Sequence, residues 1–172
     1  RDLDTFLETI VLPDAKLPFF ILGHSMGALL AMKAAPRLGN RIERMVLVAP
    51  FVGATGYSMP NWLLKFLANL ATYTGFGWVQ FARDQLIKPF EGNKVSSDRI
   101  RFERNQAIVR HHPELGLGPP TARWIAVMID AIETTTTMDH LRRIEVPALI
   151  IAPSIDEIVP YSAFEELSKK FR

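Results

Sequence analysis

The pentapeptide Gly23-His24-Ser25-Met26-Gly27 constrains the fold more than any other feature of the sequence. It follows a short apolar run, residues 19–22, that is typical of a buried strand, and it opens residues 26–35, which are rich in helix formers. A serine between two glycines on a strand-to-helix turn is the pattern of a nucleophile elbow. We expect a strained serine backbone, with no room for side chains two residues before or after it. The serine hydroxyl should then stand clear of a sheet, where a base can reach it.

Two further apolar runs predict the fold class. Residues 45–49 and 148–152 have the composition of buried strands, and we expect the helix over 26–35 to stop at Pro36. A strand, a helix and a second strand joined by short links form a βαβ unit with parallel strands. The sequence therefore predicts an α/β fold with a parallel sheet as its core.

The middle of the chain interrupts this pattern with glycines and prolines. We expect a first part of the core over 1–50, a helical cap over 51–120 and a second part of the core over 121–172. Helical spacing is found over 1–10, 61–71, 90–111, 122–134 and 161–171, and Asp139 is a candidate cap for a short turn before the last strand. The segment 61–71 is apolar almost all round, so protein, an acyl chain or a membrane surface must cover it.

A serine hydroxyl is a poor nucleophile without a base, and the base needs a carboxylate to orient it. Asp156 lies in a loop just after the third predicted strand, and carboxylates at that end of a parallel strand face the crevice of the elbow. Glu157 is the neighbouring alternative. The first free N–H of the helix, that of Met26, can stabilise a developing oxyanion.

The base is harder to place. The four histidines are His24, His111, His112 and His140. None of them follows the candidate acid, as the order of an α/β-hydrolase triad requires. The first should point away from the crevice, the adjacent pair ends a polar helix, and the last precedes its strand at the wrong end of the sheet. Adjacent histidines also point apart, which argues against a metal site. We therefore expect the base to lie beyond Arg172.

Composition excludes several function classes. The chain has no cysteine, so it has no disulfide, thiol nucleophile or cysteine-bound metal. Its net charge is only +2, which is too small for a surface that binds nucleic acid. We expect no metal or organic cofactor, no nucleic acid partner, and a cytoplasmic location that fits the absence of cysteine. Transient contact of the cap with a membrane surface stays open, and so does the oligomeric state.

Three stretches, residues 20–28, 44–50 and 144–152 followed by Asp156, resemble the α/β-hydrolase superfamily. More narrowly, the chain resembles bacterial lysophospholipases and monoacylglycerol lipases, and residues 105–124 are similar to the cap of the lysophospholipase branch. The resemblance implies a partial α/β-hydrolase fold with Ser25 as nucleophile, Asp156 as triad acid and the Met26 N–H as one oxyanion donor. It also implies that the strands supplying the second donor precede Arg1 and that the triad histidine follows Arg172.

The apolar cap favours a small lipophilic acyl ester as substrate. Its large apolar side chains are Trp62, Leu63, Leu64, Phe66, Leu67, Leu70, Phe76, Trp78 and Phe81. A proline-type aminopeptidase or a thioesterase is the first alternative, and an acidic group in the cap that binds a free amino terminus would favour the peptidase. Asp84, Glu91 and Asp98 are the candidates for that group. A non-catalytic relative that binds lipid or a protein partner is the second alternative.

Overall fold

The computed structural model describes residues 2–54, 59–80 and 87–171, so Phe81 and Asp84 lie outside the described residues. The first half holds α1 (Asp2–Phe6), the π-helical η1 (Leu7–Val11), α2 (Leu12–Asp14), β1 (Phe19–His24), α3 (Met26–Leu38), the 3-10 turn η2 (Gly39–Arg41), β2 (Ile42–Val48) and α4 (Asn61–Tyr73). The second half holds α5 (Arg99–His111), the 3-10 turn η3 (Pro113–Leu115), α6 (Ala122–Thr135), α7 (Met138–Leu141), β3 (Ala148–Ile151) and α8 (Tyr161–Lys170).

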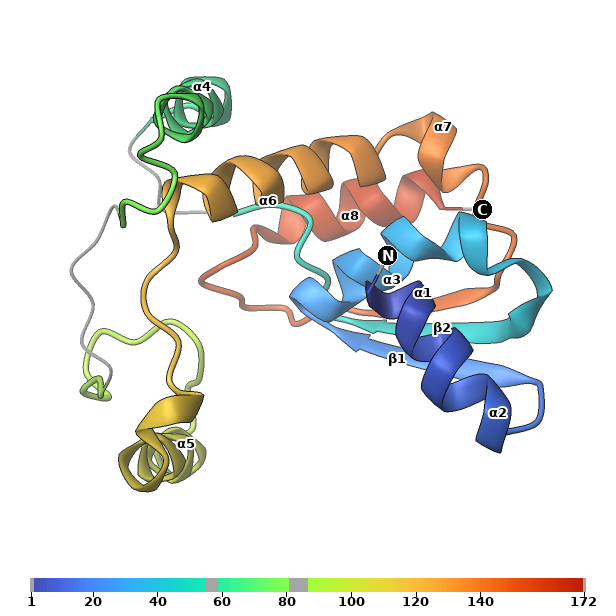
Figure 1. Cartoon of the computed structure of the whole chain (residues 1–172), viewed down its shortest axis with the longest axis horizontal. Coiled ribbons are helices and arrows are strands. Elements are labelled where there is room, and N and C mark those ends of the chain that lie inside the picture. The colour runs from blue at the N-terminus through green and yellow to red at the C-terminus, as the bar shows by residue number, and fades with distance from the viewer. Residues whose placement is uncertain (1, 55–58, 81–86, 172) are drawn as a thin grey trace. The chain divides into compact units, whose positions relative to one another are not determined.

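The three strands form one sheet in the order β1-β2-β3, and both neighbouring pairs are parallel. Gly23 of β1 pairs with Leu47 of β2, and Val48 of β2 pairs with Ile151 of β3. This confirms the predicted parallel sheet, and the βαβ unit is β1-α3-β2 (Figure 1). The register brings the carboxyl ends of all three strands to one edge of the sheet, where β1 runs into the elbow.

The described residues cover one face of the sheet. Helix α3 packs on β1 and β2, and its buried residues are Ala28, Leu29, Ala31, Met32, Ala34, Ala35 and Leu38. The prediction of fully buried strands was wrong for β1 and β3, whose residues alternate between half-buried and exposed. Leu22 is 74% exposed, and Phe20, Leu149 and Ile151 are exposed as well. The strands are thus apolar on both faces, as in a parallel sheet that is covered on both sides, but the described residues cover one.

Helix α3 continues through Pro36 to Leu38, so the predicted stop at Pro36 was wrong. Proline has no N–H, and it therefore leaves the carbonyl four residues earlier, that of Met32, without its helical hydrogen bond. The ring of His140 replaces that donor, with Nε2 lying 3.0 Å from the Met32 carbonyl oxygen. His140 is half-buried and belongs to α7, which contacts α3. A histidine weighed as a catalytic candidate is thus engaged in holding a helix.

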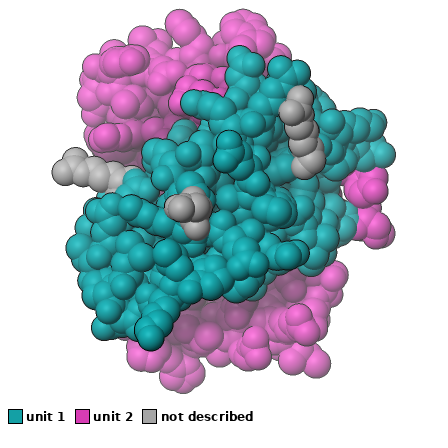
Figure 2. All heavy atoms as spheres, turned by 90° about the vertical axis from the view of Figure 1, so that its right-hand side faces the viewer, with its two compact units in different colours: residues 1–52, 135–153, 164–172 teal, residues 53–134, 154–163 magenta. Residues whose placement is uncertain are grey.

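The chain divides into two compact units, which Figure 2 distinguishes by colour. Unit 1 comprises Arg1–Val52, Thr135–Pro153 and Phe164–Arg172, and unit 2 comprises Gly53–Thr134 and Ser154–Ala163. Unit 1 contains the sheet with α3 and α7. Unit 2 contains α4, α5 and nearly all of α6.

Unit 2 has its own apolar core between α4 and α6. Leu64 and Ala68 of α4 pack with Ile125 and Ala126 of α6, and Met59 and Ile129 pack against them. Beside this core, the ammonium group of Lys65 lies 2.7 Å from Glu133 and 3.1 Å from Asp130. These hydrogen bonds, with that to Glu133 the larger cause, raise the pKa of Lys65 and keep the only charged side chain of α4 turned towards α6.

Two predicted helix starts were wrong for the same reason, which is local capping. Helix α5 begins at Arg99 rather than near residue 90, because the Asp98 side chain accepts a hydrogen bond from the Arg101 N–H (3.1 Å) and caps it there. Helix α7 is capped by Thr137, whose hydroxyl accepts from the His140 N–H (3.2 Å), and not by Asp139. In both cases the side chain that comes immediately before the helix accepts from the N–H of the third helical residue.

Candidate active site

Ser25 stands at the junction of β1 and α3 in a backbone conformation that L-residues rarely adopt. Its φ is 50° and its ψ is −117°, so the expected strain at this serine is confirmed. The side chain is half-buried and makes no capping hydrogen bond to its own helix. Serine at a helix start normally caps the helix with its hydroxyl. Here that hydroxyl is left unused among the described residues, as a nucleophile requires.

Gly23 is required by the closeness of strand and helix. A Cβ at this position would lie 2.7 Å from the Ala28 Cα and 2.9 Å from the Ala28 N, both backbone atoms of α3. A Cβ at Gly27 would meet nothing within 4 Å. The expected crowding is therefore confirmed at the first glycine of the elbow and wrong at the second, because the second faces open space within the described residues.

Replacing Gly23 with alanine is expected to destabilise the whole protein by about 1–3 kcal/mol, because strand or helix must shift to admit the methyl group. The matched control is Gly27→Ala, which should leave stability unchanged or raise it by up to about 1 kcal/mol, since alanine favours helix over glycine. Urea unfolding of the two variants measures the difference. Equal effects of the two substitutions would refute the close packing of β1 on α3 at Gly23.

The backbone of β2 holds the serine in place. The Ser25 N–H donates to the Val48 carbonyl (2.9 Å), and the Ser25 carbonyl accepts from the Phe51 N–H (3.1 Å). Between these partners, Ala49 has a φ of 44°, a second strained residue beside the first. These hydrogen bonds could not be predicted from the sequence, because backbone atoms make them. The Ala49-Pro50 pair also gives no indication of a left-handed backbone at Ala49.

Two neighbours of Ser25 complete the elbow. Met26 is the first residue of α3, and its N–H makes no hydrogen bond to a described residue, as the first N–H groups of a helix have no acceptor within it. The free N–H groups at a helix N-terminus can donate to a negative oxygen. His24 ends β1 with an exposed side chain, opposite Val48 in the register.

Asp156 lies in the loop between β3 and α8, and its carboxylate is fixed by the backbone. Oδ1 accepts hydrogen bonds from the Ile158 N–H (2.7 Å) and the Val159 N–H (2.9 Å). The Val159 side chain is buried, which anchors the turn. Oδ2 has no partner among the described residues, so the half-buried carboxylate presents one free oxygen. Glu157 is exposed. Asp156 belongs to unit 2 and Ser25 to unit 1.

The adjacent histidines of the middle segment are engaged locally. The Nδ1 of His111 lies 2.7 Å from the Ala107 carbonyl oxygen, and the Nδ1 of His112 lies 3.0 Å from Glu114. Both side chains are exposed. Among the described residues, no group of three or more His, Asp or Glu side chains could hold a metal ion.

Glu91 and Asp98, the described candidates for binding a free amino terminus, are also engaged. Glu91 forms an ion pair with Arg99 (3.6 Å), and Asp98 caps α5 and pairs with Arg101 (3.4 Å). Neither carboxylate is thus set aside for a free amino terminus.

A parallel sheet, a strained serine on a tight strand-to-helix turn and a carboxylate loop after a later strand define a partial α/β-hydrolase fold. Comparison with known proteins agrees. The model of the family described as serine aminopeptidase, S33, matches residues 1–172, and the chain belongs to this family.

Curated relatives include lysophospholipases. The chain is 29% identical over 156 residues to a probable lysophospholipase L2 of Haemophilus influenzae, covering 88% of this chain and 48% of that protein. It is 27% identical over 135 residues to lysophospholipase L2 of Escherichia coli K12, covering 77% of this chain and 39% of that protein. The chain thus spans about half the length of the curated relatives it matches or less.

Solved structures show the same fold. A soluble variant of monoglyceride lipase from Saccharomyces cerevisiae, in complex with a substrate analog, has a TM-score of 0.71 at 18% identity over 99% of this chain and 55% of that chain. Paleococcus ferrophilus monoacylglycerol lipase has a TM-score of 0.68 at 17% identity over 99% of this chain and 59% of that chain. None of the helices over the described residues has the length and apolar character needed to cross a bilayer.

Proposed function

We propose that the whole protein hydrolyses carboxylic esters of lipophilic acyl chains, such as monoacylglycerols or lysophospholipids, through an acyl-enzyme on Ser25. The observation that carries this proposal is the strained Ser25, held at a strand-to-helix turn with its hydroxyl unused by the fold. The named activities of the relatives in the same family support the substrate class.

In the proposed reaction, Ser25 Oγ attacks the ester carbonyl and passes its proton to a base. The Met26 N–H donates to the oxyanion, and the alcohol leaves with the proton that the base returns. Water then hydrolyses the acyl-serine by the same steps. Asp156 Oδ2 orients the base and stabilises its positive charge, since Oδ1 is already fixed by two backbone N–H groups.

We propose that this base is a histidine outside residues 1–172. Of the histidines within them, one replaces the missing N–H of Pro36, two have local partners, and the fourth lies exposed at the end of β1. We also propose that residues 51–120 form the cap of the substrate site. The description of the family names a serine aminopeptidase, but Glu91 and Asp98, the described candidates for binding a free amino terminus, already have partners.

A panel of substrates tests the proposal. The whole protein should hydrolyse monoacylglycerols or lysophospholipids in preference to aminoacyl-proline amides and acyl thioesters. Preference for the amides would favour the peptidase, and preference for the thioesters a thioesterase. No hydrolysis of any of them would favour a non-catalytic binding protein.

One face of α4 is both apolar and exposed. Trp62, Phe66, Leu67, Leu70 and Tyr73 lie on the side opposite the buried Leu64 and Ala68. Trp62 is 69% exposed and Tyr73 is 88% exposed, and Phe76 and Trp78 extend this stripe past the helix. We call these seven exposed side chains the α4 stripe. It carries no charge, because the only charged residue of α4 pairs with α6.

We propose that the α4 stripe rests transiently on a membrane surface, where a lipophilic ester would reside. Tryptophan and tyrosine favour the boundary between water and lipid, and exposed apolar surface of this extent marks an interaction site.

The double variant Trp62→Ser/Phe66→Ser is expected to weaken binding of the whole protein to phosphatidylcholine vesicles by about tenfold or more, because two large apolar side chains are removed. Vesicle co-sedimentation measures this. The control is Ile100→Ser/Leu117→Ser, which removes two exposed apolar side chains of unit 2 outside the stripe. Equal loss of binding in both variants would show that the α4 stripe is not the contact surface.

A further inference from the structure

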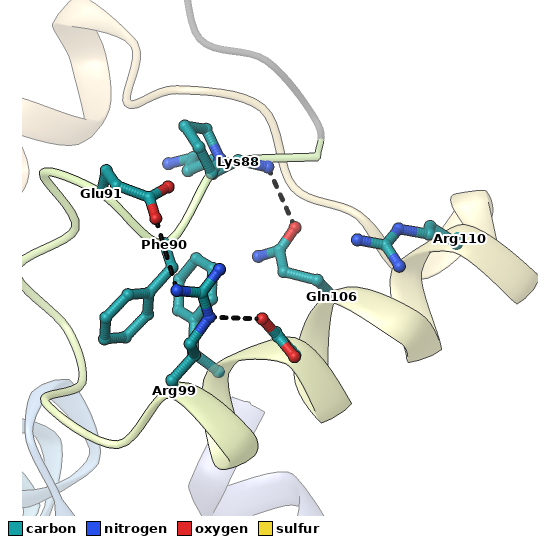
Figure 3. A pocket seen from close by; sticks show the side chains of 9 residues that line it. Lys88, Phe90, Glu91, Arg99, Gln106 and Arg110 are labelled. Atoms are coloured by element: carbon teal, nitrogen blue, oxygen red, sulfur yellow. Dashed lines mark hydrogen bonds and ion pairs between the residues drawn. The ribbon is translucent and has the colours of Figure 1, made fainter.

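A pocket of about 380 Å³ lies in unit 2, between the segment that precedes α5 and α5 itself (Figure 3). Residues 88–91 form one wall, and side chains from successive turns of α5 form the other. The walls carry more positive than negative side chains. The cations are Lys88, Arg99 and Arg110, and the carboxylates are Glu91 and Glu103.

Arg99 is held in the wall of the pocket by two ion pairs and an aromatic contact. Its Nε lies 2.8 Å from Glu103, its Nη1 lies 3.6 Å from Glu91, and its guanidinium lies over the Phe90 ring at 5.5 Å from the centroid. Phe90 in turn meets Phe102 edge to face, with ring centroids 5.5 Å apart. Both carboxylates of the pocket therefore already have a cationic partner.

Two hydrogen-bond donors on the other side of the pocket, the Gln106 amide and the Arg110 guanidinium, have no acceptor among the described residues. The Gln106 Oε1 accepts a hydrogen bond from the Lys88 backbone N–H (3.0 Å), which turns the amide NH₂ group of Gln106 away from that contact. Arg110 follows four residues later on the same face of α5, and Figure 3 shows its guanidinium on the side of Gln106. Neither this NH₂ group nor the Arg110 guanidinium has a partner among the described residues.

We propose that this pocket binds a phosphate group through Arg110 and the Gln106 amide. The carboxylates of the pocket are already paired, whereas the Arg110 guanidinium and the Gln106 NH₂ group have no partner among the described residues, so a ligand that bonds to both must supply several acceptor oxygens. A phosphate does so, and its geometry suits two parallel hydrogen bonds from a guanidinium. The phosphate would belong to a lysophospholipid headgroup, which rests on the proposed function, or to free phosphate.

Binding is tested first in the whole protein with glycerol 3-phosphate and inorganic phosphate as probes, by isothermal titration calorimetry. Arg110→Gln removes the cation, and Gln106→Glu keeps the acceptor for the Lys88 N–H but removes the NH₂ donor. Each should weaken binding by about tenfold or more. Arg104→Gln, on the same helix but outside the pocket lining, should leave it unchanged. No binding by the unmodified protein, or equal binding by all variants, would overturn the proposal, whether or not the protein hydrolyses esters.

Comparing kcat/KM for a lysophospholipid and a monoacylglycerol shows whether the phosphate belongs to a headgroup or is free. A headgroup site predicts that Arg110→Gln lowers kcat/KM for a lysophospholipid about tenfold more than for a monoacylglycerol with the same acyl chain. Weakened phosphate binding with an unchanged ratio would support the site with free phosphate as its ligand. Melting temperatures of the variants, matched to the unmodified protein, show that the fold is kept.

Discussion

Replacing Ser25 with alanine is expected to lower ester hydrolysis by the whole protein about 10⁴-fold or more, because no acyl-enzyme can form. Alanine fits the positive φ of this position no worse than serine, and the serine hydroxyl makes no hydrogen bond in the elbow. Stability should therefore stay close to that of the unmodified protein. Initial rates with a monoacylglycerol substrate measure the loss.

The control for this variant is Ser97→Ala, which removes an exposed hydroxyl outside the elbow and the acid loop. It should retain full activity. Retained hydrolysis in Ser25→Ala would place the nucleophile on another residue and remove the basis of the proposed mechanism.

Replacing Asp156 with asparagine is expected to lower kcat about 10³- to 10⁴-fold, because the base loses the charge that orients it and stabilises its protonated form. The asparagine carbonyl can still accept from the Ile158 and Val159 N–H groups, so the loop and the fold should persist. Steady-state kinetics and circular dichroism together separate loss of chemistry from loss of structure.

Glu157→Gln is the matched control, since it neutralises the adjacent, exposed carboxylate. It should reduce kcat by less than about tenfold. An unimpaired Asp156→Asn protein together with an inactive Glu157→Gln protein would transfer the role of triad acid to Glu157.

The elements that the sequence predicted well are those with strong local signals. The apolar runs gave the three parallel strands, and the glycines around Ser25 gave the strand-to-helix turn. Prediction failed at two helix starts, where local capping side chains set the boundary, and where a distant partner decides the outcome. Pro36 does not end α3 because His140, more than a hundred residues later, bonds the carbonyl that proline leaves free. The exposure of one face of the sheet could not be predicted either, because residue type does not tell which face of a strand is covered.

Some features of the candidate site could likewise be predicted from the sequence, and others could not. The strained turn at Ser25 and the crowding at Gly23 could be predicted because the motif and its position after a strand carry the information, whereas the catalytic roles of Ser25 and Met26 stay predictions. The role of Gly27 could not, since crowding at a glycine depends on what packs there. The hydrogen bonds from Ser25 to Val48 and Phe51 are made by backbone atoms. The proposed phosphate pocket depends on which side chains already have partners. Neither leaves a pattern in the residue types.

Covalent labelling shows whether Ser25 is the nucleophile. The whole protein is treated with a fluorophosphonate, and the modified peptide is located by mass spectrometry. We expect one adduct, on the Oγ of Ser25, that is absent from Ser25→Ala. An adduct on a different side chain, or ester hydrolysis without any adduct on Ser25, would contradict it.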